Sequence, residues 1–494
     1  MSRGTYALTS LVALLSAAPA TAGDWNVSSG DWDVPNNWLD GRVPTSSDSV
    51  FIANSGTAII DSGVAAECWA LRVHRGNVEL GDGSLVVGDH EQLADSIGNP
   101  CVFRQTGGLH TVNGTFGMGG NGSRATYTQS GGRFEVRGVS VPALSIREGG
   151  LYDRQQGELS VPNELSLEYS TFRQTGGDVS VGTLFYDEDC RYELAGGHLA
   201  SGSVLMATDL SGTSDAFVQT GGRHDVTGDL RMGVAGRATY QLDGGELAVG
   251  GTVSVLGYAF LGGSQMRIGA AAAQFGSVVV GSDTAANRSG VFSATSSAAR
   301  IQINDALRLK SSAVVEAVPG SSIHMTGTGG VENDSTGPSS LLGLENLEFV
   351  FENGSGAFAP FEVAGKDVGA NLAGFSNNYA LHQLTLGGVD DGLVRLVNAF
   401  DNHGDGGREA LYLDGLDIGL NSLLDLHGLL VYASESVTID GTTYLAAGGY
   451  REFMPGCYTG LTDDLSGGKV ILLPEPGTWM LLVLGALYIA RGRR

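Results

Sequence analysis

The feature that most constrains this chain is a repeat of 20–25 residues in its first half. Each unit begins at an aromatic residue, and the intervals between these residues are 24, 25, 20, 20, 25 and 23. The series runs Phe103, Tyr127, Tyr152, Phe172, Tyr192, Phe217 and Tyr240. A period of this length is typical of solenoids, in which each unit is one coil that buries its apolar face against the next coil.

Glycine, glutamine and valine hold fixed places within the unit. A glycine pair follows the aromatic residue by four positions, except in the third unit, where Gln156-Gly157 replaces it. In four units a glutamine begins this turn: Gln105, Gln129, Gln174 and Gln219. Most units have a valine nine residues after the aromatic residue: Val112, Val136, Val161, Val181, Val226 and Val249. Apolar and polar residues alternate around it, and such alternation gives a strand one buried face.

Each unit therefore predicts a strand, a Gly-Gly turn, a second strand, a glycine turn and a third strand. The predicted fold class is all-β, a β-solenoid (β-helix) with coils of about 20–25 residues. The repeat body should span 63–330 and be clearest over 103–258. A row of hydrophobic β-hairpins is the alternative. The solenoid is favoured because equivalent positions carry equivalent residues, and each fully buried Val or Leu contributes roughly 1.5–3 kcal/mol to a stack of coils.

The composition argues against nucleic acid as a partner. The chain has 53 Asp and Glu residues against 28 Lys and Arg, and its net charge is −25. Phosphate binding needs clustered cations, so the acidity instead favours an exposed, soluble protein or the attraction of cations. The four cysteines are widely spaced and form no CxxC motif, which argues against a zinc site. Cys68 with Cys101 is the favoured disulfide pair, and unpaired buried thiols are the alternative.

Two further regions flank the repeat body. Residues 23–62 predict an N-terminal β cap that contains Trp25, Trp32 and Trp38. Their spacing from Pro44 and Asp48 resembles the opening of large exported, autotransporter-like repeat proteins. The three tryptophans would either close the open end of the first coil or stack on the sugar rings of a glycan. Residues 331–473 predict a distinct C-terminal β-region.

The first 22 residues predict export. Arg3 supplies a positive start, residues 6–18 form an apolar run, and Ala20-Thr21-Ala22 matches the small-x-small pattern of a cleavage site. Residues 1–22 are therefore a predicted signal peptide. The apolar run is shorter than the roughly 20 residues that span a bilayer, so cleavage is favoured over an uncleaved anchor.

The last 21 residues, 474–494, predict attachment to a membrane. In order, they contain a proline-rich motif, an apolar run over 479–490 and a basic end: Pro474, Glu475 and Pro476, then Arg491, Arg493 and Arg494. The apolar run predicts one short transmembrane helix. Its arginines should stay in the cytoplasm, which places the body outside the inner membrane. The two prolines break structure ahead of this helix and should leave an extended, accessible segment there.

This order of motif, helix and basic end resembles the PEP-CTERM sorting signal of Gram-negative bacteria. The resemblance implies that an exosortase-type membrane enzyme recognises the tail and removes it. The protein would then be anchored in the inner membrane before processing and later located at the cell surface or in the extracellular matrix. The Gram-positive sortase signal fits less well, because Pro476 stands where that signal has its threonine. A plain C-terminal anchor is a further alternative.

The sequence contains no convincing catalytic, cofactor-binding or metal-binding motif. Residues 401–406 resemble the start of a calcium loop, but His403 and Tyr412 stand where an EF-hand has its ligands, which favours a simple turn. His110 and His224 share one repeat position on an apolar ladder, which favours packing over metal binding. The sequence therefore predicts a noncatalytic surface or extracellular-matrix protein, with extracellular polysaccharide as a candidate partner. The alternatives are a β-helical carbohydrate-active enzyme and an adhesin that binds glycans through the three tryptophans.

Overall fold

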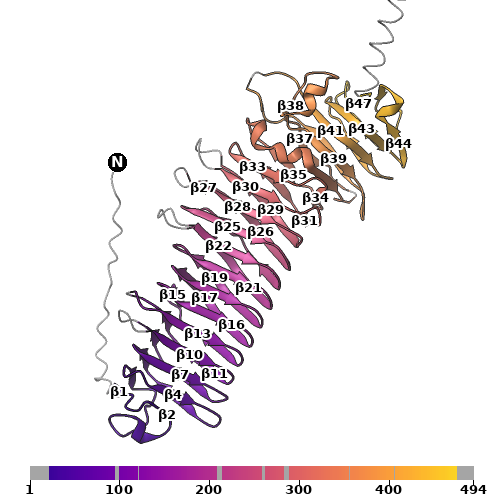
Figure 1. The fold of residues 1–494 in the computed structure, drawn as a ribbon. Helices are drawn as coiled ribbons and strands as arrows, with labels where there is room; N and C mark the ends of the chain where they lie inside the picture. Colours follow the sequence, from indigo (N-terminus) through magenta and orange to yellow (C-terminus); the bar gives the residue numbers. More distant parts are fainter. Residues whose placement is uncertain are drawn as a thin grey trace, which may run out of the picture.

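The computed structural model describes residues 22–474, apart from 95–99, 121, 208–213, 259–261, 283–288, 355 and 405. Within these residues the protein is nearly all β, and its strands stack into an elongated body with the first and last strands at opposite ends (Figure 1). Apart from Ala22 and Pro474, the predicted signal peptide and sorting tail lie outside the described residues. No helix in the described part is long and apolar enough to cross a membrane.

Three ladders of parallel strands run along the body. Ladder 1 is a sheet of its own, and the short β27 (Gly257–Tyr258) is attached to it antiparallel to β28. Its strands are β2 (Ser29–Asp31), β4 (Thr57–Ile60), β7 (Gly76–Leu80), β10 (Cys101–Gln105), β13 (Ala125–Gln129), β16 (Leu151–Arg154), β18 (Thr171–Gln174), β20 (Arg191–Leu194), β22 (Ser214–Gln219), β25 (Arg237–Leu242), β28 (Gly262–Ile268), β30 (Gly290–Ala294) and β33 (Ala313–Ala317).

Ladders 2 and 3 belong to a second, larger sheet. Ladder 2 contains β5 (Ala65–Cys68), β8 (Ser84–Val87), β11 (Leu109–Val112), β14 (Arg133–Val136), β23 (Arg223–Val226), β31 (Arg300–Ile303), β34 (Ser321–Met325), β36 (Leu347–Phe351) and β39 (Leu381–Leu386). Ladder 3 contains β1 (Ala22–Asp24), β3 (Ser49–Ile52), β6 (Ala70–Val73), β9 (His90–Leu93), β12 (Thr115–Met118), β15 (Leu144–Arg147), β24 (Leu230–Met232), β32 (Ala306–Leu309), β35 (Gly330–Asn333), β37 (Ala359–Glu362), β40 (Leu393–Val397), β42 (Leu423–Asp425) and β46 (Leu461–Thr462). Long strands that bend from one ladder into the other are β17 (Glu158–Glu168), β19 (Asp178–Tyr186), β21 (His198–Met206), β26 (Glu246–Val255) and β29 (Ala272–Val280).

The structure confirms the predicted coil of three strands and two turns. β10, the Gly107-Gly108 turn, β11, a turn at Gly114 and β12 follow one another, and each strand pairs in parallel with its equivalent in the next coil. The repeating aromatic residues lie directly on one another, with ring centroids 4.5–4.9 Å apart from Phe103 to Tyr240. The repeat read from the sequence is therefore the physical stacking period of the body.

A single apolar interior follows from this stacking. The repeated valines at the ninth position are all buried, and one cluster of buried side chains contains residues from Trp25 to Leu472. Alternate residues of β10 and of β12 are buried. Since each coil covers the apolar face of the next, the hydrophobic free energy of burial is shared along the whole body.

The glycine pairs are required by both backbone conformation and space. The second glycine of each turn has a positive φ, which is 70° at Gly132 and 68° at Gly222. A side chain there would also collide with the backbone of the preceding coil, where the carbonyl oxygen of Gly107 lies against Gly132. Turns from successive coils therefore stack as closely as the strands do, which only glycine permits.

A buried glutamine before the glycine pair links its own coil to the next one by hydrogen bonds, and we call it the connector. Gln174 donates from Nε2 to the carbonyl oxygens of Gly177 in its own turn and His198 in the next coil, each at 3.0 Å. Its Oε1 accepts a hydrogen bond of 2.6 Å from the Tyr192 hydroxyl of the next coil. Gln105, Gln129 and Gln219 repeat this arrangement with Tyr127, Tyr152 and Tyr240. Each glutamine thus satisfies buried backbone groups that the turn would otherwise leave without partners.

This connector explains the choice between tyrosine and phenylalanine along the aromatic stack. Every coil with the glutamine is followed by a tyrosine, whose hydroxyl finds an acceptor. Where Arg154 or Leu194 occupies the glutamine position, the next aromatic residue is Phe172 or Phe217. A tyrosine hydroxyl there would be buried without a glutamine oxygen to accept its proton, which is unfavourable.

Residues 331–473, predicted as a distinct C-terminal β-region, continue two of the three ladders. β34 pairs with β36 and β35 with β37 in parallel register, so the larger sheet passes the predicted boundary without a break. Ladder 1 ends at β33, against which the 3-10 helices η2 (Pro338–Ser340) and η3 (Leu342–Asn346) pack. The described part of 331–473 therefore differs from the repeat body because it has no strand of ladder 1. The remaining 3-10 helices are η1 (Pro35–Asn37), η4 (Leu372–Phe375) and η5 (Ala446–Gly448).

The final strands close the C-terminal end. β41 (Glu409–Ile418) and β43 (Leu430–Ile439) extend ladder 2, and β47 (Lys469–Leu472) pairs with β43. The strands β38 (Gly365–Lys366), β44 (Thr442–Leu445) and β45 (Arg451–Phe453) are antiparallel to their neighbours.

No disulfide joins the four cysteines, of which three are buried and Cys457 is exposed. The favoured disulfide between Cys68 and Cys101 is therefore absent from the structure, and Cys101 instead donates from Sγ to the Val73 carbonyl at 3.2 Å. The alternative of buried thiols without a disulfide holds for these two residues.

The pairing of a glutamine with the tyrosine of the next coil can be tested by introducing it into a pair of coils that lacks it. We expect Phe217→Tyr alone to destabilise the protein by roughly 1–3 kcal/mol, because its buried hydroxyl has no acceptor. Adding Leu194→Gln in the preceding coil should recover most of this loss, since the pair reproduces Gln174 and Tyr192. Urea denaturation gives the free energies of unfolding of wild type, both single variants and the double variant. Together these give the coupling free energy between positions 194 and 217. Additive single effects would contradict this pairing.

Candidate functional site

The three N-terminal tryptophans form a buried cluster. Trp25, Trp32 and Trp38 are 3%, 0% and 1% exposed. Trp38 contacts both other rings edge-on, at centroid distances of 4.9 and 4.8 Å, and donates from Nε1 to the Trp32 carbonyl. The cluster lies beside β1 and β2, the first strands of their ladders, so it closes the end of the stack.

The prediction of glycan contact at Trp25, Trp32 and Trp38 is corrected by this burial. Stacking on a sugar needs an exposed ring face, and the fold uses these faces for packing against one another and the first coils. The sequence showed three aromatic residues near one end but not which way they point. Capping, the alternative considered with glycan binding, agrees with the geometry.

The residues of the sorting motif lie mostly outside the described residues. Pro474 is described and buried, two positions after the end of β47. The backbone N–H of Leu473 still donates to the Ala433 carbonyl at 2.9 Å. Glu475 and Pro476, the apolar run 479–490 and the basic residues Arg491, Arg493 and Arg494 are outside the described part. The motif therefore begins where the stacked fold ends.

His110 belongs to a buried polar group inside the solenoid. Its Nε2 lies 2.7 Å from Oε2 of Glu91, and both side chains are fully buried. Its Nδ1 lies 2.9 Å from the Tyr127 hydroxyl, which donates to Gln105. The imidazole ring is stacked between Phe103 and Phe134, at centroid distances of 4.8 and 4.3 Å. Oε1 of Glu91 has no hydrogen-bond partner. This group joins neighbouring coils and has no access to a substrate.

His224 repeats the position of His110 without an acidic partner. Its Nδ1 lies 3.0 Å from the Tyr240 hydroxyl and its Nε2 lies 3.0 Å from the Ser201 hydroxyl. Burial lowers the pKa of His224 to about 3, so the ring is neutral near pH 7. Both histidines therefore lie within the packed interior, as their apolar repeat position predicts.

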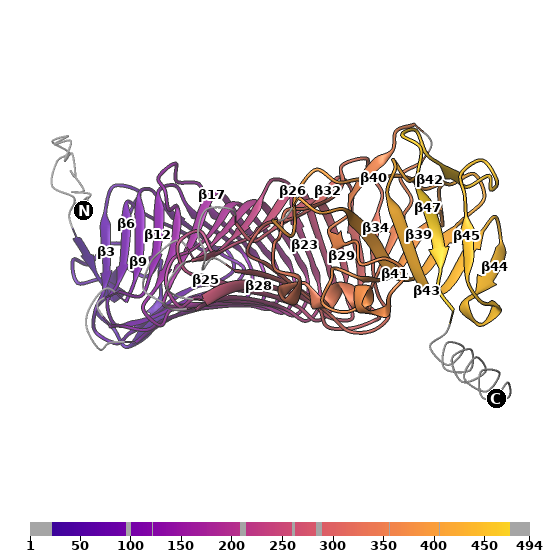
Figure 2. The ribbon, with the colours of Figure 1, turned by 90° about the horizontal axis from the view of Figure 1, so that it is seen from above.

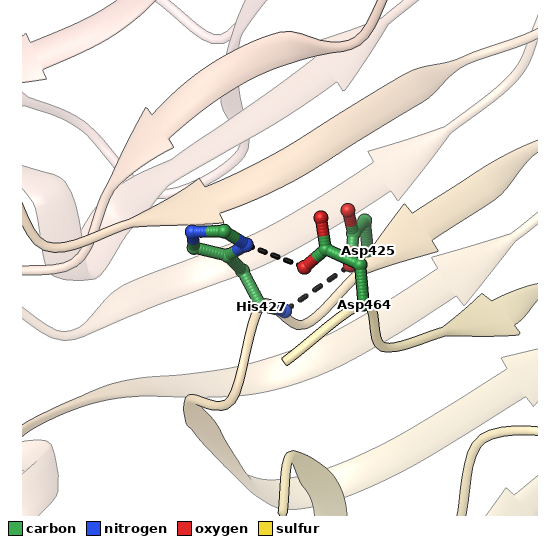
Figure 3. Close-up of side chains that lie close together, drawn as sticks. All are labelled: Asp425, His427 and Asp464. Carbon is green, nitrogen blue, oxygen red and sulfur yellow. Dashed lines mark hydrogen bonds and ion pairs between the residues drawn. The ribbon is translucent and has the colours of Figure 1, made fainter. Parts of the chain in front are cut away.

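One group on the surface has the residue types of a metal site. Asp425 ends β42, His427 lies in the turn that follows it, and Asp464 lies in the turn after β46; Figure 3 shows His427 turned towards Asp464. His427 Nδ1 lies 2.5 Å from Asp464 Oδ1. Their ligand atoms lie within 4.8 Å of one another, the one such set of three found among the described residues.

A guanidinium group already neutralises these carboxylates. Arg395 Nε lies 2.7 Å from Asp425, and its Nη2 lies 3.1 Å from Asp464. The hydrogen bond from His427 and then the charges of His427 and Arg395 lower the pKa of the exposed Asp464. The arrangement is a charge network that ties two turns together, since a cation would have to compete with Arg395 for the same oxygens. The sequence could not reveal it, because the pairing of β42 with β46 brings its members together.

In the segment 401–406, which resembles the start of a calcium loop, Asp401 stabilises the turn that it begins. Asp401 accepts hydrogen bonds from the backbone N–H groups of Gly404 and Gly406, at 2.7 and 3.0 Å. Both carboxylate oxygens are therefore used within the turn, as the alternative of a simple turn predicts.

Two open hollows on the outer surface are further places where a ligand could bind. A hollow of about 600 Å³ lies along ladder 2, and one of about 660 Å³ lies along ladder 3. The first contains the ion pairs Arg223–Glu246 and His324–Glu352, at 2.9 and 3.2 Å. The second contains Arg147–Glu168, at 3.2 Å. Glu246 and Glu168 are therefore paired with arginines and Glu352 with a histidine, whereas Glu148 of the second hollow accepts a hydrogen bond from the backbone N–H of Gly122.

Comparisons of the chain with protein-family models, with curated proteins and with solved structures returned no match. Its function is therefore inferred from its own residues.

The buried Glu91–His110 pair gives a stability test. We expect His110→Phe alone to cost roughly 3–5 kcal/mol, because it leaves Glu91 buried without its partner. The double variant Glu91→Leu/His110→Phe should be at least as stable as wild type, since Leu71 and Phe134 occupy the equivalent positions in neighbouring coils. Thermal and urea denaturation measure both. A double variant as unstable as the single variant would show that the pair is required for the fold.

Proposed function

We propose that this chain is a noncatalytic, exported structural protein that forms a stiff rod at the cell surface or in the extracellular matrix. The observation that carries the proposal is the continuous apolar interior, which extends from Trp25 to Leu472 and makes one body of the stacked coils. Its repeated polar residues, the glutamines and two histidines, are used inside the rod rather than at a surface site. A predicted export signal at one end and a predicted sorting signal at the other agree with such a role.

The place of the sorting motif supports processing of the tail. β47 ends at Leu472, and the motif begins at Pro474. Cleavage within or after the motif would remove no strand of the described fold, so the rod would survive it. An exosortase-type enzyme would be the processing partner, and the apolar run 479–490 would hold the precursor in the inner membrane. The acidity of the chain, whose full sequence has a net charge of −25, would keep the released rod soluble beside extracellular polysaccharide.

Localisation of the tagged chain tests this proposal. The full chain should be held in the membrane first and then reach the cell surface, whereas a chain lacking 474–494 should remain in the periplasm or be released into the medium. Glu475→Ala keeps the apolar run and is the matched control, because it should leave the precursor in the membrane and slow its processing. If all three forms have the same location, the tail has no sorting function.

A second candidate function is a β-helical carbohydrate-active enzyme. It is favoured by the hollow on ladder 2, where successive coils bring together Arg300, Glu246 and Glu352. Against it, Glu246 and Glu352 are engaged with Arg223 and His324. The noncatalytic role is therefore preferred.

We expect the purified protein to leave neutral and acidic polysaccharides intact, as measured by chain length and release of reducing ends. The variant Glu246→Gln/Glu352→Gln provides the control for trace contamination. Depolymerisation by wild type that disappears in this correctly folded variant would establish the enzyme and contradict the proposal.

A further inference from the structure

The C-terminal end of the rod is built differently from its coils. β47 is the last parallel strand on β43, and the antiparallel strands β44 and β45 then cover β43 and β47 respectively. Figures 1 and 2 show β44 at the end of the body opposite β1. This end surface comprises the described residues of 440–460.

The end surface exposes large apolar side chains around an aromatic cluster. Leu445, Tyr450 and Met454 are 60%, 53% and 54% exposed. Between them, the Tyr444 ring lies 5.1 Å from Phe453 and 6.3 Å from Tyr458, and the Arg451 guanidinium lies 4.4 Å above Tyr444. Exposed leucine and methionine beside tyrosine and arginine is the residue combination of a membrane–water interface, where rings and cationic groups meet lipid headgroups.

We propose that this end surface, through Leu445, Tyr450, Arg451 and Met454, rests on the headgroup layer of a lipid membrane. The inference rests on the proposed function, in which the apolar run 479–490 is inserted in the bilayer before processing. The described chain leaves the body at Pro474, and Arg451 is the register partner of Leu472 in the neighbouring strand. Only 475–478 separate Pro474 from the apolar run, and these residues can span at most about 18 Å. An inserted tail would therefore hold this end of the rod close to the membrane.

The charges of this surface agree with such contact. Its acids Asp440 and Glu452 are balanced by Arg451 and by Lys469, which lies 2.9 Å from Glu452, so this surface carries no net charge. The chain as a whole carries a charge of −25, so the rest of the rod should be repelled by anionic lipids. The rod would then stand on its C-terminal end and project its N-terminal end away from the membrane.

Cys457 offers a direct probe of this contact. It is exposed, whereas Cys68, Cys101 and Cys190 are buried, so a thiol-reactive fluorophore on the full chain should label it selectively. The labelled chain is reconstituted into vesicles of phosphatidylethanolamine and phosphatidylglycerol that carry nitroxide-labelled headgroups. Flotation measures vesicle binding separately. The control carries the fluorophore at the opposite end, in Ser62→Cys/Cys457→Ser.

We expect the fluorophore at Cys457 to be quenched several-fold more than the one at position 62. Leu445→Asp/Met454→Asp should reduce this quenching while flotation stays unchanged, because the tail still anchors the chain. Bound protein whose Cys457 fluorophore escapes quenching, or whose quenching survives the double variant, would overturn the inference and leave the proposed anchoring intact. Loss of quenching on dilution of the protein within the vesicles would assign the surface to a second copy instead. Failure to bind vesicles at all would contradict the proposed function.

Discussion

The structure depends on the stacking of each coil on an equivalent coil. Parallel register places like residues on one another, so every position must suit both its own coil and its two neighbours. For aromatic residues this produces a continuous stack, and for glycine it produces turns that approach too closely for any side chain. The glutamine at the start of the turn supplies hydrogen bonds that the stacked turns require. It donates to carbonyl groups of two coils and accepts a hydrogen bond from a tyrosine hydroxyl. The apolar interior of the rod therefore contains a column of hydrogen-bonded glutamine and tyrosine side chains.

This construction has a consequence for function. The chemically versatile side chains of the repeat, including His110 and His224, are used for cohesion between coils and are out of reach of ligands. Glu168, Glu246 and Glu352, which line the two surface hollows, are paired with arginine or histidine. Function is consequently expected from the length of the rod, its acidic surface and its two different ends. One end is closed by buried tryptophans, and the other exposes apolar residues beside the predicted tail.

The sequence predicted the coil well because the repeat is a physical period. Val112 and Val136, like the aromatic series, could be assigned to a buried ladder from spacing alone. The glutamine–tyrosine connector was missed, although its signal was present: tyrosine follows Gln174 and phenylalanine follows Leu194. Other features had no local signal. The orientation of Trp25, the contact of His427 with Asp464 and the loss of ladder 1 after β33 depend on chain segments that meet only in the fold.

Distances between spin labels on the outer face of ladder 1 test the stacked rod most directly. Glu79, Arg173 and Gln241 occupy equivalent positions four and seven coils apart from the first. Adjacent parallel strands are separated by about 4.8 Å, so the label-to-label distance should grow in proportion to the number of coils, to roughly 19 Å and 34 Å. Distances that fail to increase with coil number, or that vary broadly, would mean that the units fold separately and that the continuous interior does not exist.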